Sequence, residues 1–203
     1  MRTFISICIF EGGLGLVAWT LGLLFGCSPL TTIKFTWESV AWGVVGTLPL
    51  ILVLLLLERS RWSGIAEIRG VVRKILVPLF QNFSLWQLFF VALFAGLGEE
   101  ILFRGFVQGG LEILLNYFNL PAASIVSLFI TSMLFGVMHP ITRTYALLCM
   151  LAGLYLGGLW LWSNNLIIPI VVHALYDFFA LFYLLRRYRL DIEDMLPHRD
   201  AGS

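Results

Sequence analysis

Residues 85–115 decide the fold, and they read LWQLFFVALFAGLGEEILFRGFVQGGLEILL. The stretch is long and apolar enough to cross a bilayer as a helix, because about 20 apolar residues at about 1.5 Å each span the hydrocarbon core. It nevertheless carries Glu99, Glu100 and Arg104 near its middle. Ionisable side chains are costly at membrane depth, so the segment predicts a membrane helix that contributes to a buried polar site.

The rest of the chain is similarly apolar. Of its 203 residues, 60% are hydrophobic and 12% are charged, and the mean hydropathy is +0.93. Soluble domains have about 25% charged residues, so this composition excludes an ordinary soluble protein. The net charge of +1 gives no support for a nucleic-acid partner.

Five further apolar segments are candidates for membrane spans. They cover residues 3–25, 40–57, 122–138, 145–162 and 166–185. We therefore expect an all-α, polytopic membrane protein with about six transmembrane helices, forming one helical domain over residues 1–203. Glu11 interrupts the first apolar run and no clear small-residue cleavage site follows, so we expect this run to remain as a helix and not to be removed as a signal peptide.

Residues 61–79 predict a helix of a different kind. Its apolar side chains fall near one helical face and its basic side chains lie towards the other. The apolar set is Ile65, Ile68, Val72, Ile75, Leu76 and Leu79, and the basic set is Arg69, Arg73 and Lys74. We expect an interfacial amphipathic helix that lies flat on the membrane. The alternative is a loop whose apolar residues pack on the helix bundle.

The Lys and Arg residues outside the spans predict the orientation, because cytoplasmic segments carry an excess of basic residues. With a cytoplasmic N-terminus, one basic residue, Lys34, falls outside the cell and eleven fall inside. The eleven are Arg2, Arg59, Arg61, Arg69, Arg73, Lys74, Arg143, Arg186, Arg187, Arg189 and Arg199. This asymmetry predicts that both termini are cytoplasmic.

Apart from Glu11, the ionisable residues at membrane depth form three clusters on three different predicted helices. In the first cluster, Glu100 and Arg104 are four residues apart and predict an ion pair on one helix face. Glu99 faces about 100° away from Glu100. It is therefore free to act elsewhere, and such a carboxylate can serve as a general base.

The other two clusters supply histidines. His139 ends the fourth predicted span just before Pro140, and His173 is one helical turn before Asp177. Asp177 is placed to bond one ring nitrogen of His173 and so fix the tautomer presented by the other. A single membrane histidine most simply forms an interhelical hydrogen bond. Two histidines together with a free carboxylate favour a buried active site instead.

Small residues accompany these clusters. Glu11 stands among Gly12, Gly13 and Gly15, and we interpret it as a group near a helix end or at a close helix contact. Five glycines lie around the third span: Gly96, Gly98, Gly105, Gly109 and Gly110. One interpretation is that they let neighbouring backbones approach or open a groove, and the other is that they reflect loose helix packing.

Three motifs in this order resemble those of one family of intramembrane endopeptidases. They are Glu-Glu-x-x-Phe-Arg at 99–104, Phe-x-x-x-His at 135–139 and His-x-x-x-Asp at 173–177. The family is that of the CAAX-processing and bacteriocin-processing (CPBP, or Abi) proteases, related to the type II CAAX prenyl proteases. The resemblance covers residues 85–185 as a family-like catalytic core. It implies a hydrolase of the bacterial plasma (inner) membrane that cuts a membrane-associated, in some cases lipidated, protein or peptide.

The resemblance also implies roles for the residues. Glu99 and His139 would hold and deprotonate the attacking water, and His173 with Asp177 would stabilise the oxyanion. The site would be shaped by Glu100, Arg104, Phe103 and Phe135. The family often has Asn at position 177, whereas an ionised Asp177 can only accept a hydrogen bond. Either Asp177 is protonated or it orients His173, and we favour the second because a neighbouring histidine favours the charged carboxylate.

Other chemistries stay open at this point. No cofactor is expected, with zinc as the alternative, because Glu99, His139 and His173 have the side-chain types that bind catalytic zinc, although the chain lacks a His-Glu-x-x-His pattern. The alternative functions are a proton-coupled carrier with a relay through these residues and Asp177, and a non-catalytic immunity or scaffold protein. The expected partners are a membrane-associated substrate and the lipid bilayer.

Overall fold

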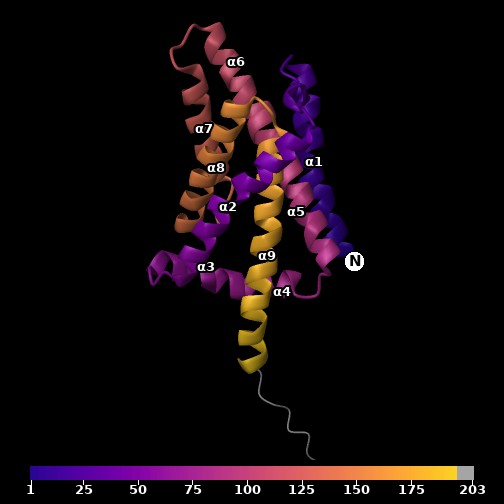
Figure 1. The fold of residues 1–203 in the computed structure, drawn as a ribbon, viewed down its shortest axis with the longest axis vertical. Coiled ribbons are helices and arrows are strands. Elements are labelled where there is room, and N and C mark those ends of the chain that lie inside the picture. The colour runs from indigo at the N-terminus through magenta and orange to yellow at the C-terminus, as the bar shows by residue number, and fades with distance from the viewer. Residues whose placement is uncertain (196–203) are drawn as a thin grey trace, which may run out of the picture.

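The computed structural model describes residues 1–195, with side chains up to residue 188. All regular secondary structure in this part of the chain is helical, and the long helices form an elongated bundle (Figure 1). Five helices within it are long and apolar enough to cross a membrane. They are α1 (Arg2–Leu24), α2 (Trp37–Arg59), the continuous helix Leu85–Tyr117, α8 (Arg143–Ser163) and α9 (Ile167–Met195). The predicted all-α, polytopic membrane architecture is confirmed.

The predicted span at residues 122–138 forms a shorter helix, α7 (Ala123–Val137), of 15 residues. At about 1.5 Å per residue it is about 22 Å long, less than the roughly 30 Å of hydrocarbon. The helix ends before Pro140, and it packs against α8, where Gly136 allows close approach to Ala146 and Met150. This early end allows the turn that carries His139 to lie beside the bundle.

The helix Leu85–Tyr117 consists of three parts. α5 (Leu85–Glu100) begins at a capping box, in which Ser84 and Gln87 each accept a hydrogen bond from the other's backbone N–H. The next part, η3 (Ile101–Gln108), is π-helical, and α6 (Gly109–Tyr117) returns to α-helical geometry. π-Helical turns are rare and are frequent at functional sites. Here the wide turns follow directly after Glu99 and Glu100.

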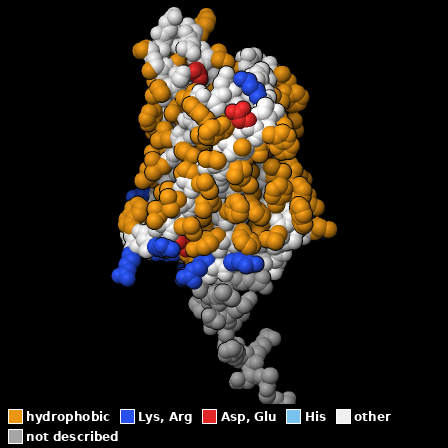
Figure 2. All heavy atoms as spheres, viewed as in Figure 1, with side chains coloured by type: hydrophobic (Ala, Val, Ile, Leu, Met, Phe, Trp, Pro, Cys, Tyr) orange, Lys and Arg blue, Asp and Glu red, His pale blue; other side chains and the backbone are white. Residues whose placement is uncertain are grey.

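The predicted amphipathic helix is present and lies across one end of the bundle (Figure 1). It comprises α3 (Ser63–Val71), the π-helical η2 (Val72–Leu76) and α4 (Val77–Phe80). Ile65, Val72 and Val77 are buried, whereas Ile75 and Leu79 are exposed. The predicted apolar face is therefore divided: one part packs on the bundle and another faces outward. Figure 2 shows Lys and Arg side chains gathered at this end, below a broad hydrophobic surface.

Helix α9 lies at the centre of the bundle, against α2, α5 and α8 (Figure 1). It continues to Met195, ten residues beyond the predicted end at Leu185. This last part extends past the other helices at the end of the bundle that carries α3 (Figure 1). There Tyr188 donates a hydrogen bond of 2.6 Å to Glu58 of α2, and Arg73 stacks on the Tyr188 ring at 4.8 Å. Residues 196–203 of the predicted domain, including Arg199, lie outside the described residues.

Candidate active site

A buried ion pair lies at the centre of the bundle. Arg104 Nη1 donates a hydrogen bond of 2.9 Å to Glu100 Oε1, and both side chains are almost completely buried. Arg104 Nη2 donates to the carbonyl oxygen of Gly153 on α8 at 3.2 Å. The predicted ion pair at i, i+4 is therefore present. Because both charges are removed from water, each depends on the other for compensation.

Glu100 also binds a histidine from another helix. His173 Nδ1 of α9 donates to the same Glu100 oxygen at 2.8 Å, while its Nε2 faces Asp177 Oδ2 at 3.5 Å. Asp177 was the predicted partner of one ring nitrogen of His173, and Glu100 is an additional partner with a shorter contact. The spacing within one helix indicated Asp177, whereas the approach of Glu100 depends on how α5 packs against α9.

A second acid and histidine lie near this centre. The distance from Glu99 Oε2 to His139 Nε2 is 3.7 Å, and Glu99 Oε2 is buried without a hydrogen-bond partner. His139 Nδ1 donates a 2.7 Å hydrogen bond to the carbonyl oxygen of Phe135. Since a carbonyl oxygen only accepts, the neutral ring presents the lone pair of Nε2 towards Glu99. Glu99 and Nε2 thus form a pair of acceptors.

Phe135 connects the two centres. Its ring centroid lies 4.6 Å from that of His139 and 6.1 Å from that of His173. The Arg104 guanidinium lies over the same ring at 4.6 Å, and Phe103 packs edge-on against it at 4.9 Å. Phe135 is buried, so it separates Arg104 from the surroundings and fixes both imidazoles. The three motif segments therefore meet around one aromatic side chain.

Glycines bring the helices close enough for these contacts. A Cβ on Gly96 would lie 2.7 Å from the backbone nitrogen of Ala174, next to His173. A Cβ on Gly98 would lie 1.8 Å from the carbonyl oxygen of Glu11. Gly105 meets Pro29, which precedes α2 in the 3₁₀ turn η1 (Pro29–Thr32), with similar closeness. Of the two interpretations of these glycines, close backbone approach is the correct one at Gly96, Gly98 and Gly105.

Glu11 is a member of this region that the sequence did not assign to it. The residue lies in the middle of α1, not near a helix end, and its carbonyl is in contact with α5 at Gly98. Its Oε2 atom is buried without a hydrogen-bond partner. The available signal was an acidic side chain among glycines in an apolar helix, but one sequence cannot show which helix it faces.

The structure gives no metal-binding geometry to these residues. In the part of the chain described, no group of three or more His, Cys, Asp or Glu side chains is arranged to hold a metal ion. The ligand set of the zinc alternative, Glu99, His139 and His173, is thus not assembled. Glu99 faces His139, whereas His173 is bonded to Glu100.

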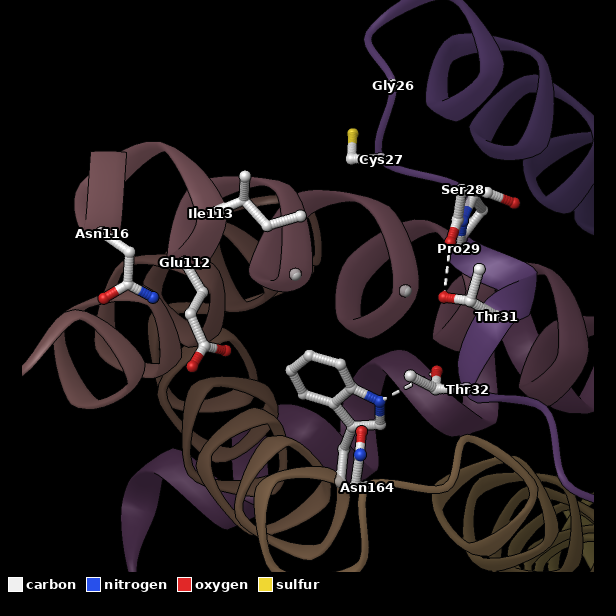
Figure 3. Close-up of a pocket in the computed structure, with 13 residues that line it drawn as sticks. Gly26, Cys27, Ser28, Pro29, Thr31, Thr32, Glu112, Ile113, Asn116 and Asn164 are labelled. Carbon is white, nitrogen blue, oxygen red and sulfur yellow. Dashed lines mark hydrogen bonds between the residues drawn. The ribbon is translucent and has the colours of Figure 1, made fainter. Parts of the chain in front are cut away.

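Two cavities lie away from the predicted site residues. One, of about 430 Å³, is bordered by the turn that contains η1, by α6 and by the end of α8, with Glu112, Asn116 and Asn164 in its wall (Figure 3). The other, of about 480 Å³, is an apolar groove between α2 and α9. Neither contains Glu99, His139 or His173. At the site itself, the side chains of His139 and Asp177 are 24% and 32% exposed.

One comparison with known proteins finds a similarity to a family. No curated protein and no solved structure matches the chain. Residues 81–179 match the model of the family described as type II CAAX prenyl endopeptidase Rce1-like, consistent with the resemblance to the CPBP proteases. The matched segment contains α5, α7 and the part of α9 that carries His173 and Asp177. Over residues 81–179, just under half of its length, the chain is therefore similar to the Rce1-like family of type II CAAX prenyl endopeptidases, which are proteases.

Proposed function

We propose that this protein is an intramembrane endopeptidase in which Glu99 and His139 activate a water molecule. The observation that carries the proposal is the pair of acceptors at 3.7 Å, Glu99 Oε2 and the lone pair of His139 Nε2. A water molecule about 2.8 Å from each would donate one hydrogen to Glu99 and the other to His139. Its own lone pair would then point away from both, towards a substrate carbonyl.

In this mechanism Glu99 takes the proton of the attacking water and His139 orients it. The oxygen of the water bonds to the carbonyl carbon, and the carbonyl oxygen becomes an oxyanion that needs donors already in place. His173 is our candidate donor. Its Nδ1 proton is used by Glu100, so Nε2 must carry a second proton to donate. The carboxylate of Asp177 at 3.5 Å supports that form.

We propose a substrate that is membrane-associated and reaches the site from the end of the bundle that carries α3. The partial exposure of His139 and Asp177 supports access for a peptide. The Lys and Arg side chains at that end support a cytoplasmic location for it, and therefore a plasma (inner) membrane protein of a bacterium with cytoplasmic termini (Figure 2). The family description makes a prenylated CAAX protein one candidate substrate.

The proposal is tested by comparing peptide termini in membranes of cells that carry the parental protein or Glu99→Gln. Gln keeps the size of the side chain but is not a base, so we expect termini that form only with the parental protein. Lys34→Ala, a change at an exposed residue outside the site, is the matched control and should give the parental pattern. Both variants must be present in the membrane at the parental amount.

Identical termini in parental and Glu99→Gln cells would contradict the peptidase proposal. Two alternatives would then remain. A proton-coupled carrier would show a Glu99-dependent flux in reconstituted liposomes. A non-catalytic immunity or scaffold protein would keep its phenotype in Glu99→Gln.

A further inference from the structure

Glu11 brings an additional carboxyl group into the bundle from a helix outside the family match. The match covers residues 81–179, whereas Glu11 belongs to α1. A carboxyl oxygen that is buried without a hydrogen-bond partner is costly, above all in a membrane helix. Glu11 Oε2 is such an atom, and Glu99 Oε2 is another. Two adjacent helices therefore each contribute an unsatisfied carboxyl oxygen to the protein interior.

The contact between α1 and α5 places Glu11 at the depth of Glu99. The carbonyl oxygen of Glu11 fills the space that a side chain at Gly98 would need, and Gly98 directly precedes Glu99. On either side of this contact, Gly12 lies against Phe94, and Gly15 lies against Gly98 and Ile101. The three contacts fix the position of α1 along α5, so the backbone of Glu11 cannot move away from Glu99 without separating the helices.

The charges that surround Glu11 are those of the candidate site. The titratable groups close enough to influence it are Glu99 of α5, His173 and Asp177 of α9, and His139 after α7, and Glu11 in turn influences Cys8 of its own helix. Arg104, the buried cation of the site, is bonded to Glu100 and Gly153. No described Lys or Arg ion pair therefore compensates Glu11. Two nearby carboxylates whose buried oxygens lack a hydrogen-bond donor are strongly disfavoured unless one of them holds a proton.

We propose that Glu11 is a positioning residue of this site, and that its carboxyl group shares one proton with Glu99 and thereby fixes the Glu99 side chain. The shared proton satisfies both buried oxygens with one hydrogen bond, donated by the protonated carboxyl and accepted by the other. It leaves the pair with one negative charge, which Glu99 uses towards His139 and the water. This inference rests on the proposed peptidase function.

The test compares Glu11→Gln with Glu11→Leu in the full-length protein in its membrane. Gln has an N–H that donates a hydrogen bond to Glu99, whereas Leu has no donor. We expect Glu11→Leu to slow the formation of the Glu99-dependent termini by about 10- to 100-fold, because Glu99 loses its fixed position. Glu11→Gln should recover a large part of that rate. Gly13→Ala is the control on the same helix, since a Cβ there meets nothing within 4 Å, and it should keep the parental rate.

A second measurement separates positioning from a structural role. Replacing a buried polar group by an apolar one of similar size is often neutral or stabilising. Glu11→Leu should therefore have a melting temperature in detergent at or above the parental value while its rate falls. Three results would each overturn the inference. The first is a parental rate in Glu11→Leu, and the second is an equally slow rate in Glu11→Leu and Glu11→Gln. The third is a slower rate in Glu11→Leu that is accompanied by a lower melting temperature. Termini that persist in Glu99→Gln would instead overturn the peptidase proposal itself.

Discussion

At the level of single residues, Glu100 joins two of the motif segments through one carboxyl oxygen. One of its oxygens accepts from Arg104 of its own helix and from His173 of α9. The i, i+4 spacing predicted the first bond, because that geometry belongs to any helix. The second bond was not predicted, because it depends on which helix lies opposite. The predicted approach of Asp177 to His173 is likewise local to one helix, whereas the place of Glu11 beside α5 depends on how two helices pack.

The ion pair predicts a non-additive effect on stability. Arg104→Met leaves Glu100 charged and buried with only His173 as a partner, so we expect the free energy of unfolding to fall by about 3–5 kcal/mol. The double variant Glu100→Gln/Arg104→Met leaves no unpaired charge and should be more stable than Arg104→Met alone. Unfolding in mixed micelles measures both effects. A double variant that loses as much free energy of unfolding as Arg104→Met, or more, would show that the two residues do not depend on each other.

Position 177 predicts a graded effect on the rate. Asp177→Asn supplies an amide that accepts from His173 and also has an N–H for the oxyanion, so it should keep a substantial part of the activity. Asp177→Leu removes both capacities and should slow the reaction by about 10²- to 10³-fold. The measurement is the rate of formation of Glu99-dependent termini. A parental rate in Asp177→Leu would remove this residue from the mechanism.

At the level of helices, the structure differs from the prediction in the length of α7 and in the π-helical type of η3. The segment 122–138 is apolar enough for a span, yet α7 has only 15 residues and ends before Pro140. The shorter helix is consistent with His139 lying next to Glu99, which is near the middle of the helix Leu85–Tyr117. The π-helical part η3 was also not predicted, since hydrophobic periodicity does not separate it from an α-helix over so few residues.

Two glycines predict opposite responses to the same change. Gly98→Ala would place a methyl group 1.8 Å from the backbone of Glu11, so α1 must move away from α5. We expect a lower melting temperature and at least about a tenfold slower reaction, because the displacement begins next to Glu99. Gly13→Ala meets nothing within 4 Å and should raise or preserve the stability of α1. Similar melting temperatures for the two variants would contradict the close contact.

For the whole molecule, the distribution of basic residues predicts which end faces the cytoplasm. Lys34 lies between α1 and α2, whereas Arg61 precedes α3 at the opposite end of α2, and both are exposed. In a background with Cys8, Cys27 and Cys149 replaced by Ala, a membrane-impermeant thiol reagent should label Lys34→Cys in intact spheroplasts but not Arg61→Cys. Both should be labelled after permeabilisation. Labelling of Arg61→Cys in intact spheroplasts would reverse the proposed orientation.

The sequence by itself determined the all-helical membrane architecture, the amphipathic helix at residues 61–79 and the family motifs. These features follow from properties that are local in the chain, namely hydropathy, helical periodicity and short spacings. Only the tertiary structure decided that Glu100 binds both Arg104 and His173, that Phe135 contacts both imidazoles, and that α1 brings the carbonyl of Glu11 to Gly98. Each of these depends on how closely two helices approach, which is set by small residues such as Gly96 and Gly98 on facing helices and is not encoded in either helix alone.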